Sequence, residues 1–95
     1  MADLGDYRLI NNSNTTFVVR TLPYTLVVFP GVEMTFREIY LRCNYTSAFN
    51  PLTRKMEWYK TDYNVTYEMI MQAIEQEAQR FGFAVEKKEK EVIVK

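Results

Sequence analysis

The sequence predicts an α+β fold: a mostly antiparallel β-sheet with one main amphipathic helix, residues 66–81, packed on it and a β-hairpin at the C-terminus. Three observations lead to this prediction. Short runs of β-branched and aromatic residues alternate with turn residues near the N-terminus, apolar residues recur at helical spacing over 66–81, and the segment 83–95 requires a chain reversal. A chain of 95 residues has the size of one domain, so we expect a single domain spanning 1–95.

The N-terminal part of the chain reads as short strands separated by turns. Residues 7–10 and 15–21 flank the polar turn NNSN and have strand-like composition. Residues 24–29, YTLVVF, are nearly all apolar or β-branched, which suits a strand covered on both faces. Pro30-Gly31 then predicts a turn.

The helix over 66–81 has both an apolar face and recognisable ends. Thr66 is a good N-cap, and Val65 before it can pack on Ile70 as a hydrophobic staple. Gly82 stands where a left-handed C-cap residue belongs. The apolar face consists of Tyr67, Ile70, Ile74, Ala78 and Phe81.

The C-terminal segment 83–95 cannot be one continuous strand with a single apolar face. Phe83 and Val85 occupy odd positions, whereas Val92 and Val94 occupy even positions. A hairpin that turns near Lys88-Glu89 removes this conflict. The charge run KKEKE at its tip is interpreted as a solubilising and edge-protecting device.

The segment 34–43, MTFREIYLRC, has two interpretations. As a helix it has a capping box, Thr35 with Glu38, and a staple of Met34 on Ile39. With a second helix over 51–60, the helix over 66–81 and a β-hairpin wing at 83–95, the elements would follow in the order of a winged-helix DNA-binding domain. In this interpretation Leu41 and Tyr45 lie off the apolar stripe of the first helix, and the second helix has no well-defined apolar face.

The strand interpretation satisfies more constraints and is the one we favour. Odd positions from Ile39 to Tyr45 are all apolar or aromatic, and NPLTR at 50–54 begins with turn residues. In the simplest antiparallel register Tyr45 faces Tyr59 and Arg42 faces Asp62. The segments on either side of 50–54 are therefore predicted to form a hairpin.

The composition excludes most catalytic chemistry. The sequence has no His, one Cys and three widely separated Gly. It therefore lacks the usual general base, the commonest transition-metal ligand, a structural zinc site and a phosphate-binding loop. We expect no enzyme activity, no catalytic or metal-binding residues and no cofactor, and we interpret Cys43 as a buried core thiol.

The charge and the N-terminal pattern bear on where the protein acts. The net charge is zero, which is unlike a general nucleic-acid binder. No signal peptide is visible, and no apolar run approaches the ~20 residues that span a bilayer, so we expect no membrane association and a cytoplasmic location. Four Asn in N-x-S/T form are interpreted as turn, cap and strand residues rather than glycan acceptors: Asn11, Asn14, Asn44 and Asn64.

One face of the predicted central hairpin interleaves aromatic and cationic side chains. The candidate interface consists of Tyr40, Arg42, Met56, Trp58 and Lys60. These residue types are enriched at protein interfaces, so the expected function is non-enzymatic binding of another protein. The alternative is a nucleic-acid binder, through this aromatic and basic platform or as a winged helix. A third interpretation places Trp58 in the core under the helix.

The size and composition suit a viral or phage accessory protein, acting as an inhibitor of a host factor or as a virion assembly component. Such a protein would lie in the host cell cytoplasm or in the virion. Exposed strand edges allow pairing between chains, so a homodimer is a further expectation.

Overall fold

The computed structural model of the protein describes residues 4–95 and shows an α+β fold with mainly antiparallel strand pairing. In chain order the elements are a 3-10 helix (Leu4–Asp6), β1 (Arg8–Asn11), β2 (Phe17–Val19), β3 (Leu26–Val28), β4 (Glu33–Thr35), α1 (Phe36–Asn44), β5 (Tyr45–Asn50), β6 (Lys55–Lys60), α2 (Tyr67–Arg80), β7 (Val85–Lys88) and β8 (Glu91–Val94). The three N-terminal strands expected from the sequence are present; β1 has the expected four residues, whereas β2 and β3 have three each and are shorter than the runs 15–21 and 24–29.

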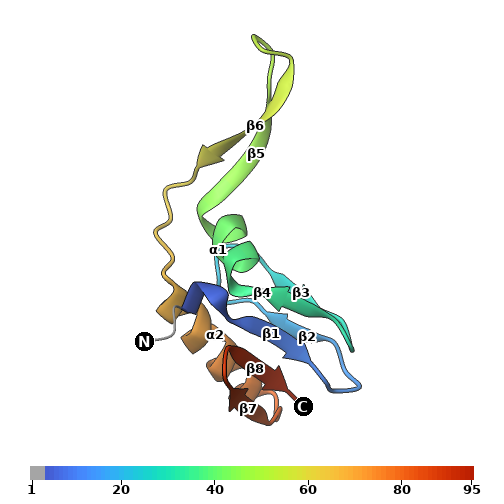
Figure 1. The fold of residues 1–95 in the computed structure, drawn as a ribbon. Coiled ribbons are helices and arrows are strands. Elements are labelled where there is room, and N and C mark those ends of the chain that lie inside the picture. Colours follow the sequence, from blue (N-terminus) through green and yellow to red (C-terminus); the bar gives the residue numbers. More distant parts are fainter. Residues whose placement is uncertain (1–3) are drawn as a thin grey trace.

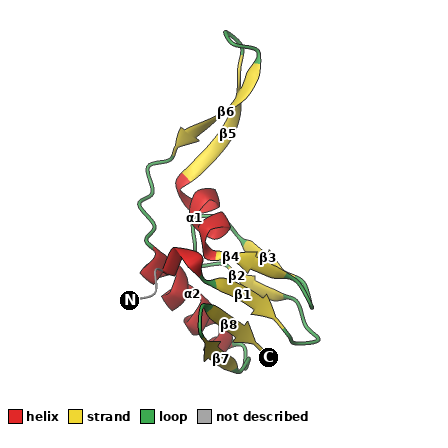
Figure 2. Ribbon diagram, in the orientation of Figure 1, coloured by secondary structure: helices red, strands yellow, loops and turns green. Residues whose placement is uncertain are grey.

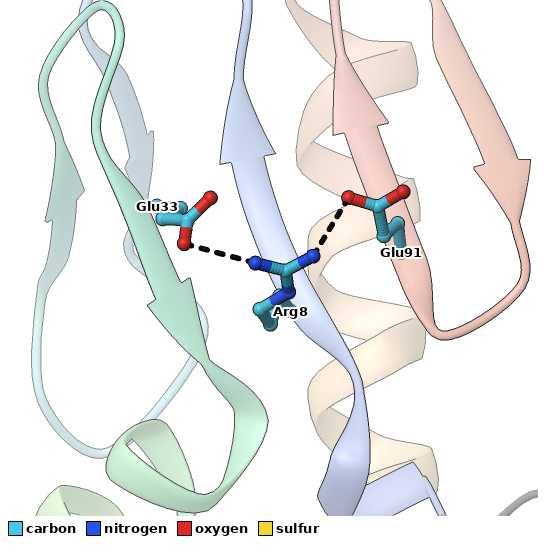
Figure 3. A network of polar contacts seen from close by, with 3 residues as sticks. All are labelled: Arg8, Glu33 and Glu91. Atoms are coloured by element: carbon cyan, nitrogen blue, oxygen red, sulfur yellow. Dashed lines mark hydrogen bonds and ion pairs between the residues drawn. The ribbon is translucent and has the colours of Figure 1, made fainter.

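The main sheet has four strands in the order β4-β1-β8-β7. Strand β1 is antiparallel to β4 and parallel to β8, while β7 and β8 form the expected C-terminal hairpin. Arg8 on β1 reaches both neighbouring strands, and it donates hydrogen bonds of 3.1 Å to Glu33 on β4 and to Glu91 on β8 (Figure 3). These pairs are exposed, so they contribute little energy but reinforce the strand register.

The core lies where α1 and α2 pack against the strands (Figures 1 and 2). Phe17 of β2 meets Phe83 edge to face, with ring centroids 5.2 Å apart. The fully enclosed side chains of the core include Leu9, Phe17, Leu26, Phe36, Ile39, Ile70, Ile74 and Val92. Both helices and the N- and C-terminal strands contribute to this core, so it joins distant parts of the chain.

Helix α2 confirms the expected element at 66–81, including both of its ends. The Thr66 hydroxyl accepts a hydrogen bond of 3.2 Å from the Met69 N–H. Gly82 has φ +79°, the left-handed conformation that follows many helices. The Phe83 N–H then donates to the Ala78 carbonyl at 2.8 Å and closes the C-terminal turn.

The favoured strand interpretation of 34–43 is wrong over most of its length, because residues 36–44 form helix α1. The Thr35 hydroxyl accepts a hydrogen bond of 3.1 Å from the Glu38 N–H, as a capping residue does. Arg42 therefore does not lie opposite Asp62 in a ladder. The helix buries Phe36, Ile39 and Cys43 against the core, and this gain outweighs the alternation from 39 to 45.

The winged-helix alternative is wrong as well, because residues 55–60 form strand β6. A central hairpin does form, but only over 45–60 and with a register one residue away from the predicted one. Tyr45 lies opposite Lys60, and Phe49 lies opposite Met56.

Candidate functional site on the projecting hairpin

Residues 45–60 form a hairpin, called the arm below, that extends away from the remaining described residues, called the body (Figure 1). The molecule measures 48 × 31 × 21 Å along its principal axes. Its radius of gyration is 14.7 Å, whereas a compact domain of about 100 residues has a value of about 13 Å. None of the buried core side chains found among residues 4–95 belongs to the arm. The arm is therefore built outside the core.

The tip of the arm is closed by the turn that Asn50-Pro51 begins. The Asn50 side-chain oxygen accepts a hydrogen bond of 2.9 Å from the Leu52 N–H. The Arg54 N–H donates to the Asn50 carbonyl at 2.7 Å, and Arg54 adopts φ +58° to bring the chain back. Local side-chain and backbone bonds thus hold the tip without any contact to the core.

The base of the arm is held by the buried amide of Asn44. Its side-chain nitrogen donates hydrogen bonds of 3.0 Å to the carbonyls of Tyr40 and Val65, and its side-chain oxygen accepts one of 2.8 Å from the Val65 N–H. The Thr61 N–H also donates to the Asn44 carbonyl at 2.8 Å. These bonds tie the end of α1 to the segment that returns from the arm.

One face of the arm is apolar and exposed. Cross-strand neighbours share a face, so the register places Tyr45, Ser47 and Phe49 beside Lys60, Trp58 and Met56. Trp58, Met56 and Phe49 are 66%, 63% and 59% exposed. Leu41, at the end of α1, joins Tyr45 and Trp58 around an apolar pocket of about 250 Å³. We call Leu41, Tyr45, Phe49, Met56 and Trp58 the aromatic face.

The opposite face of the arm is polar and internally bonded. The Glu57 carboxylate accepts hydrogen bonds from the side chains of Asn50, Thr53 and Tyr59. These bonds, that from Asn50 first, hold the pKa of Glu57 below its usual value. The hydrogen bonds on the polar face therefore stabilise the hairpin without using side chains of the aromatic face.

Lys60 lies on the same face as Trp58, but its charge is turned toward its own chain. The ammonium group donates to the carbonyls of Thr61 and Tyr63, and it lies 3.4 Å from the Asn64 side-chain oxygen. It also lies 6.0 Å from the centre of the Tyr45 ring. Its donors are therefore engaged at the base of the arm instead of pointing outward.

The structure brings together three of the five residues expected at the interface: Met56, Trp58 and Lys60. Arg42 is exposed on α1, outside the hairpin. Tyr40 is half-buried on α1 and stacks on Tyr67 at 4.8 Å between centroids, so it belongs to the packing of the two helices.

Sequence reasoning missed Leu41, Tyr45 and Phe49 as members of this face. A signal was present for two of them, because Leu41 and Tyr45 do not fit the apolar stripe of α1. An apolar residue that a helix does not bury is a candidate surface residue, and Leu41 is 44% exposed.

Cys43 and two of the Asn residues lie in the interior. Burial raises the pKa of the Cys43 thiol to about 11, so the thiol is protonated at neutral pH. Asn11 and Asn44 are fully enclosed, and their amides are hydrogen-bonded within the fold. Among residues 4–95, no three His, Cys, Asp or Glu side chains are grouped as a metal site would require.

Comparison with protein-family models, with curated proteins and with solved structures found no match to this chain. No helix within residues 4–95 has the length and apolar character needed to cross a membrane. A proposal about function therefore rests on the surfaces of the protein itself.

Proposed function

We propose that this protein is a non-enzymatic binding module that uses the aromatic face of the arm to bind another protein. The observation that carries the proposal is the exposure of Trp58, Met56 and Phe49 side by side on an element that contributes nothing to the core. Trp, Met and Phe are enriched where proteins meet, and a central Trp is a frequent hot spot of binding.

The aromatic face offers enough apolar area to anchor a partner. Enclosed aromatic side chains bury about 150–250 Å² each, and apolar burial contributes roughly 25 cal/mol per Å². Covering Trp58 and Phe49 would thus contribute roughly 5 kcal/mol before the entropic costs of association. The best-fitting partner presents an apolar ridge that enters the pocket between Leu41, Tyr45 and Trp58.

Nucleic-acid binding is the second candidate, and Arg54 and Lys55 at the tip of the arm favour it. Backbone phosphates need outward cations beside the stacking rings. On the aromatic face the only cation among the described residues is Lys60, whose ammonium group is bonded to its own chain. A protein partner therefore fits the chemistry of this face better.

The kind of protein to which this chain corresponds is also part of the proposal. Small size, abundant Tyr and the absence of His suit a viral or phage accessory protein that inhibits a host factor or takes part in virion assembly. Such a protein would act in the host cytoplasm or in the virion.

The test starts with affinity capture from the native host, followed by purification of the captured protein and titration calorimetry. Trp58→Ala should weaken its binding at least about tenfold, since a central aromatic anchor is worth more than 1–2 kcal/mol. Phe81→Ala is the matched control, because Phe81 is also an exposed aromatic residue, at 58% against 66% for Trp58, but lies on the body. Equal losses in both variants would contradict a binding site on the arm.

The same proteins can be titrated with single- and double-stranded DNA at increasing salt. The proposal expects no tight binding. Micromolar or tighter affinity that falls steeply with salt and requires Arg54 and Lys55 would instead establish the second candidate.

A further inference from the structure

The two outer edges of the arm differ in a way that matters for strand pairing. In the part of the chain that the structure describes, β5 and β6 pair only with each other, so each has one free backbone edge. Strand β6 carries Lys55, Glu57 and Lys60, charges of the kind that guard exposed edges. Strand β5, YTSAFN, has neither a charged residue nor Pro or Gly along its six residues.

The other edge strands within residues 4–95 are short or guarded. Strands β2, β3 and β4 have three residues each. Strand β7 has four residues and carries Lys87 and Lys88. Short length and lysines both discourage pairing with another chain. Among the described strands, β5 thus combines greatest length with no such protection.

We propose that the free edge of β5 pairs antiparallel with β5 of a second copy of this chain, forming a four-stranded sheet across a two-fold axis. The inference does not depend on the proposed function, because the pairing uses backbone groups and leaves the aromatic face open. A two-stranded hairpin alone is only marginally stable in water, whereas a sheet of three or more strands with an apolar face can be stable by itself. Pairing would therefore stabilise the arm.

The alternation of hydrogen-bonded pairs along the arm determines which residues of β5 direct their backbone N–H and C=O groups away from β6. The bond from the Thr61 N–H to the Asn44 carbonyl makes these two residues a hydrogen-bonded pair. Since such pairs alternate along an antiparallel ladder, Thr46 and Ala48 bond inward to β6. The backbone groups of Tyr45, Ser47 and Phe49 therefore point away from β6, toward the free edge.

Only registers that bring these outward residues together can form the new ladder. The symmetric one places Ser47 opposite Ser47 of the second copy and Tyr45 opposite Phe49 of the second copy. It forms about six backbone hydrogen bonds and two aromatic cross-strand pairs. The side chains of Tyr45, Ser47 and Phe49 all lie on the aromatic face, so the two copies join their aromatic faces on one side of the sheet.

Charge and symmetry favour a second copy as the occupant. The strand is uncharged, so an identical strand meets no repulsion along the ladder. The antiparallel direction carries the two cationic tips, with Arg54 and Lys55, to opposite ends of the sheet. A two-fold contact of identical surfaces is also the commonest form of oligomer.

The first experiment is sedimentation velocity on the full chain without any partner. Wild type should be a dimer, and Ser47→Lys should weaken it at least about tenfold, because like charges directly opposite are destabilising. Met56→Lys is the matched control: it adds the same charge to the same face, but on β6, away from the axis. A monomeric wild type, or a Ser47→Lys dimer as tight as wild type, would overturn the proposal.

The second experiment reads the register directly and does not depend on the lysine variant. Cα atoms opposite each other in a hydrogen-bonded pair lie about 5.5 Å apart, within disulfide range. Ser47→Cys should therefore cross-link into a covalent dimer under mild oxidation, whereas Thr46→Cys should not. Native Cys43 is 1% exposed and stays out of the reaction. Failure of Ser47→Cys to cross-link, or equal cross-linking of both variants, would refute pairing centred on Ser47.

The two proposals fail separately in these tests. A monomer that still binds a protein through Trp58 would refute the pairing of β5 alone. If the chain forms a dimer that cross-links at position 47, but Trp58→Ala does not weaken binding of the captured protein, only the binding role of the aromatic face is refuted.

Discussion

At the scale of single residues, the side chain of Asn44 decides how the arm leaves the body. Its amide satisfies both the N–H and the carbonyl of Val65, which are buried with it. A backbone donor or acceptor left without a partner in such a place costs about 1–3 kcal/mol. Asn44 is thus a structural residue, although its spacing to Thr46 is that of a glycan acceptor.

Asn44→Ala is expected to lower the free energy of unfolding by about 2–4 kcal/mol, because two buried backbone groups lose their partner. Urea titration followed by circular dichroism measures this loss. Asn64→Ala is the matched control, since Asn64 is exposed, and should change stability by less than about 0.5 kcal/mol. Similar values for both variants would show that the amide of Asn44 is not a structural tie.

The sequence pattern placed Trp58 on an exposed face, and Trp58 is 66% exposed in the structure, but the pattern did not identify all of its neighbours. Trp58 could be singled out because a Trp that alternates with Met56 and Lys60 marks one face of a strand. Tyr45 was expected opposite Tyr59, and therefore on the other face from Trp58, because a shift of one residue in register moves every side chain to the other face. No local signal distinguishes the two registers, since the turn at 50–54 permits both.

At the scale of elements, α1 shows that a capping signal can outweigh an alternating pattern. The alternation from Ile39 to Tyr45 exists because the chain passes from a helix into a strand at 44–45, and the two patterns overlap there. The N-cap signal of Thr35 was correct, and it describes the start of the element. The sequence contains no equally clear signal for its end.

Thr35→Ala should destabilise the protein by about 1 kcal/mol, because the Glu38 N–H loses its side-chain acceptor. Thr66→Ala should cost about as much by the same mechanism on α2. Thermal or urea unfolding measures both, with Thr46→Ala on the arm as a control expected to change little. If Thr35→Ala matches that control, the cap of α1 does not contribute to stability.

At the scale of the whole molecule, the body and the arm follow different rules. The body buries the side chains of the core, whereas the arm exposes apolar rings and depends on local bonds at its tip and base. A chain of this size has a small core, and the apolar residues that it holds outside the core are the basis of the proposed binding role.

Removing the arm should therefore leave the body folded. Asn44 and Thr61 face each other through a 2.8 Å hydrogen bond, so a two-residue Asn-Gly turn can replace residues 45–60. The truncated protein should unfold cooperatively and lose no more than about 1–2 kcal/mol of stability, while losing partner binding. Circular dichroism, denaturant titration and calorimetry check these outcomes. An unfolded truncated protein would show that the arm is part of the folding unit.

The sequence by itself determined the α+β class, helix α2 with both caps, and the C-terminal hairpin, because each depends on periodicity and end signals within about 15 residues. It also marked Trp58 as the centre of a candidate interface. Only the tertiary structure decided that residues 36–44 are helical, that the hairpin register places Trp58 beside Tyr45, and that the arm projects from the body. These features depend on contacts between distant segments, such as Asn44 with Val65. Such contacts cannot be predicted from the pattern of residues that are neighbours in the sequence.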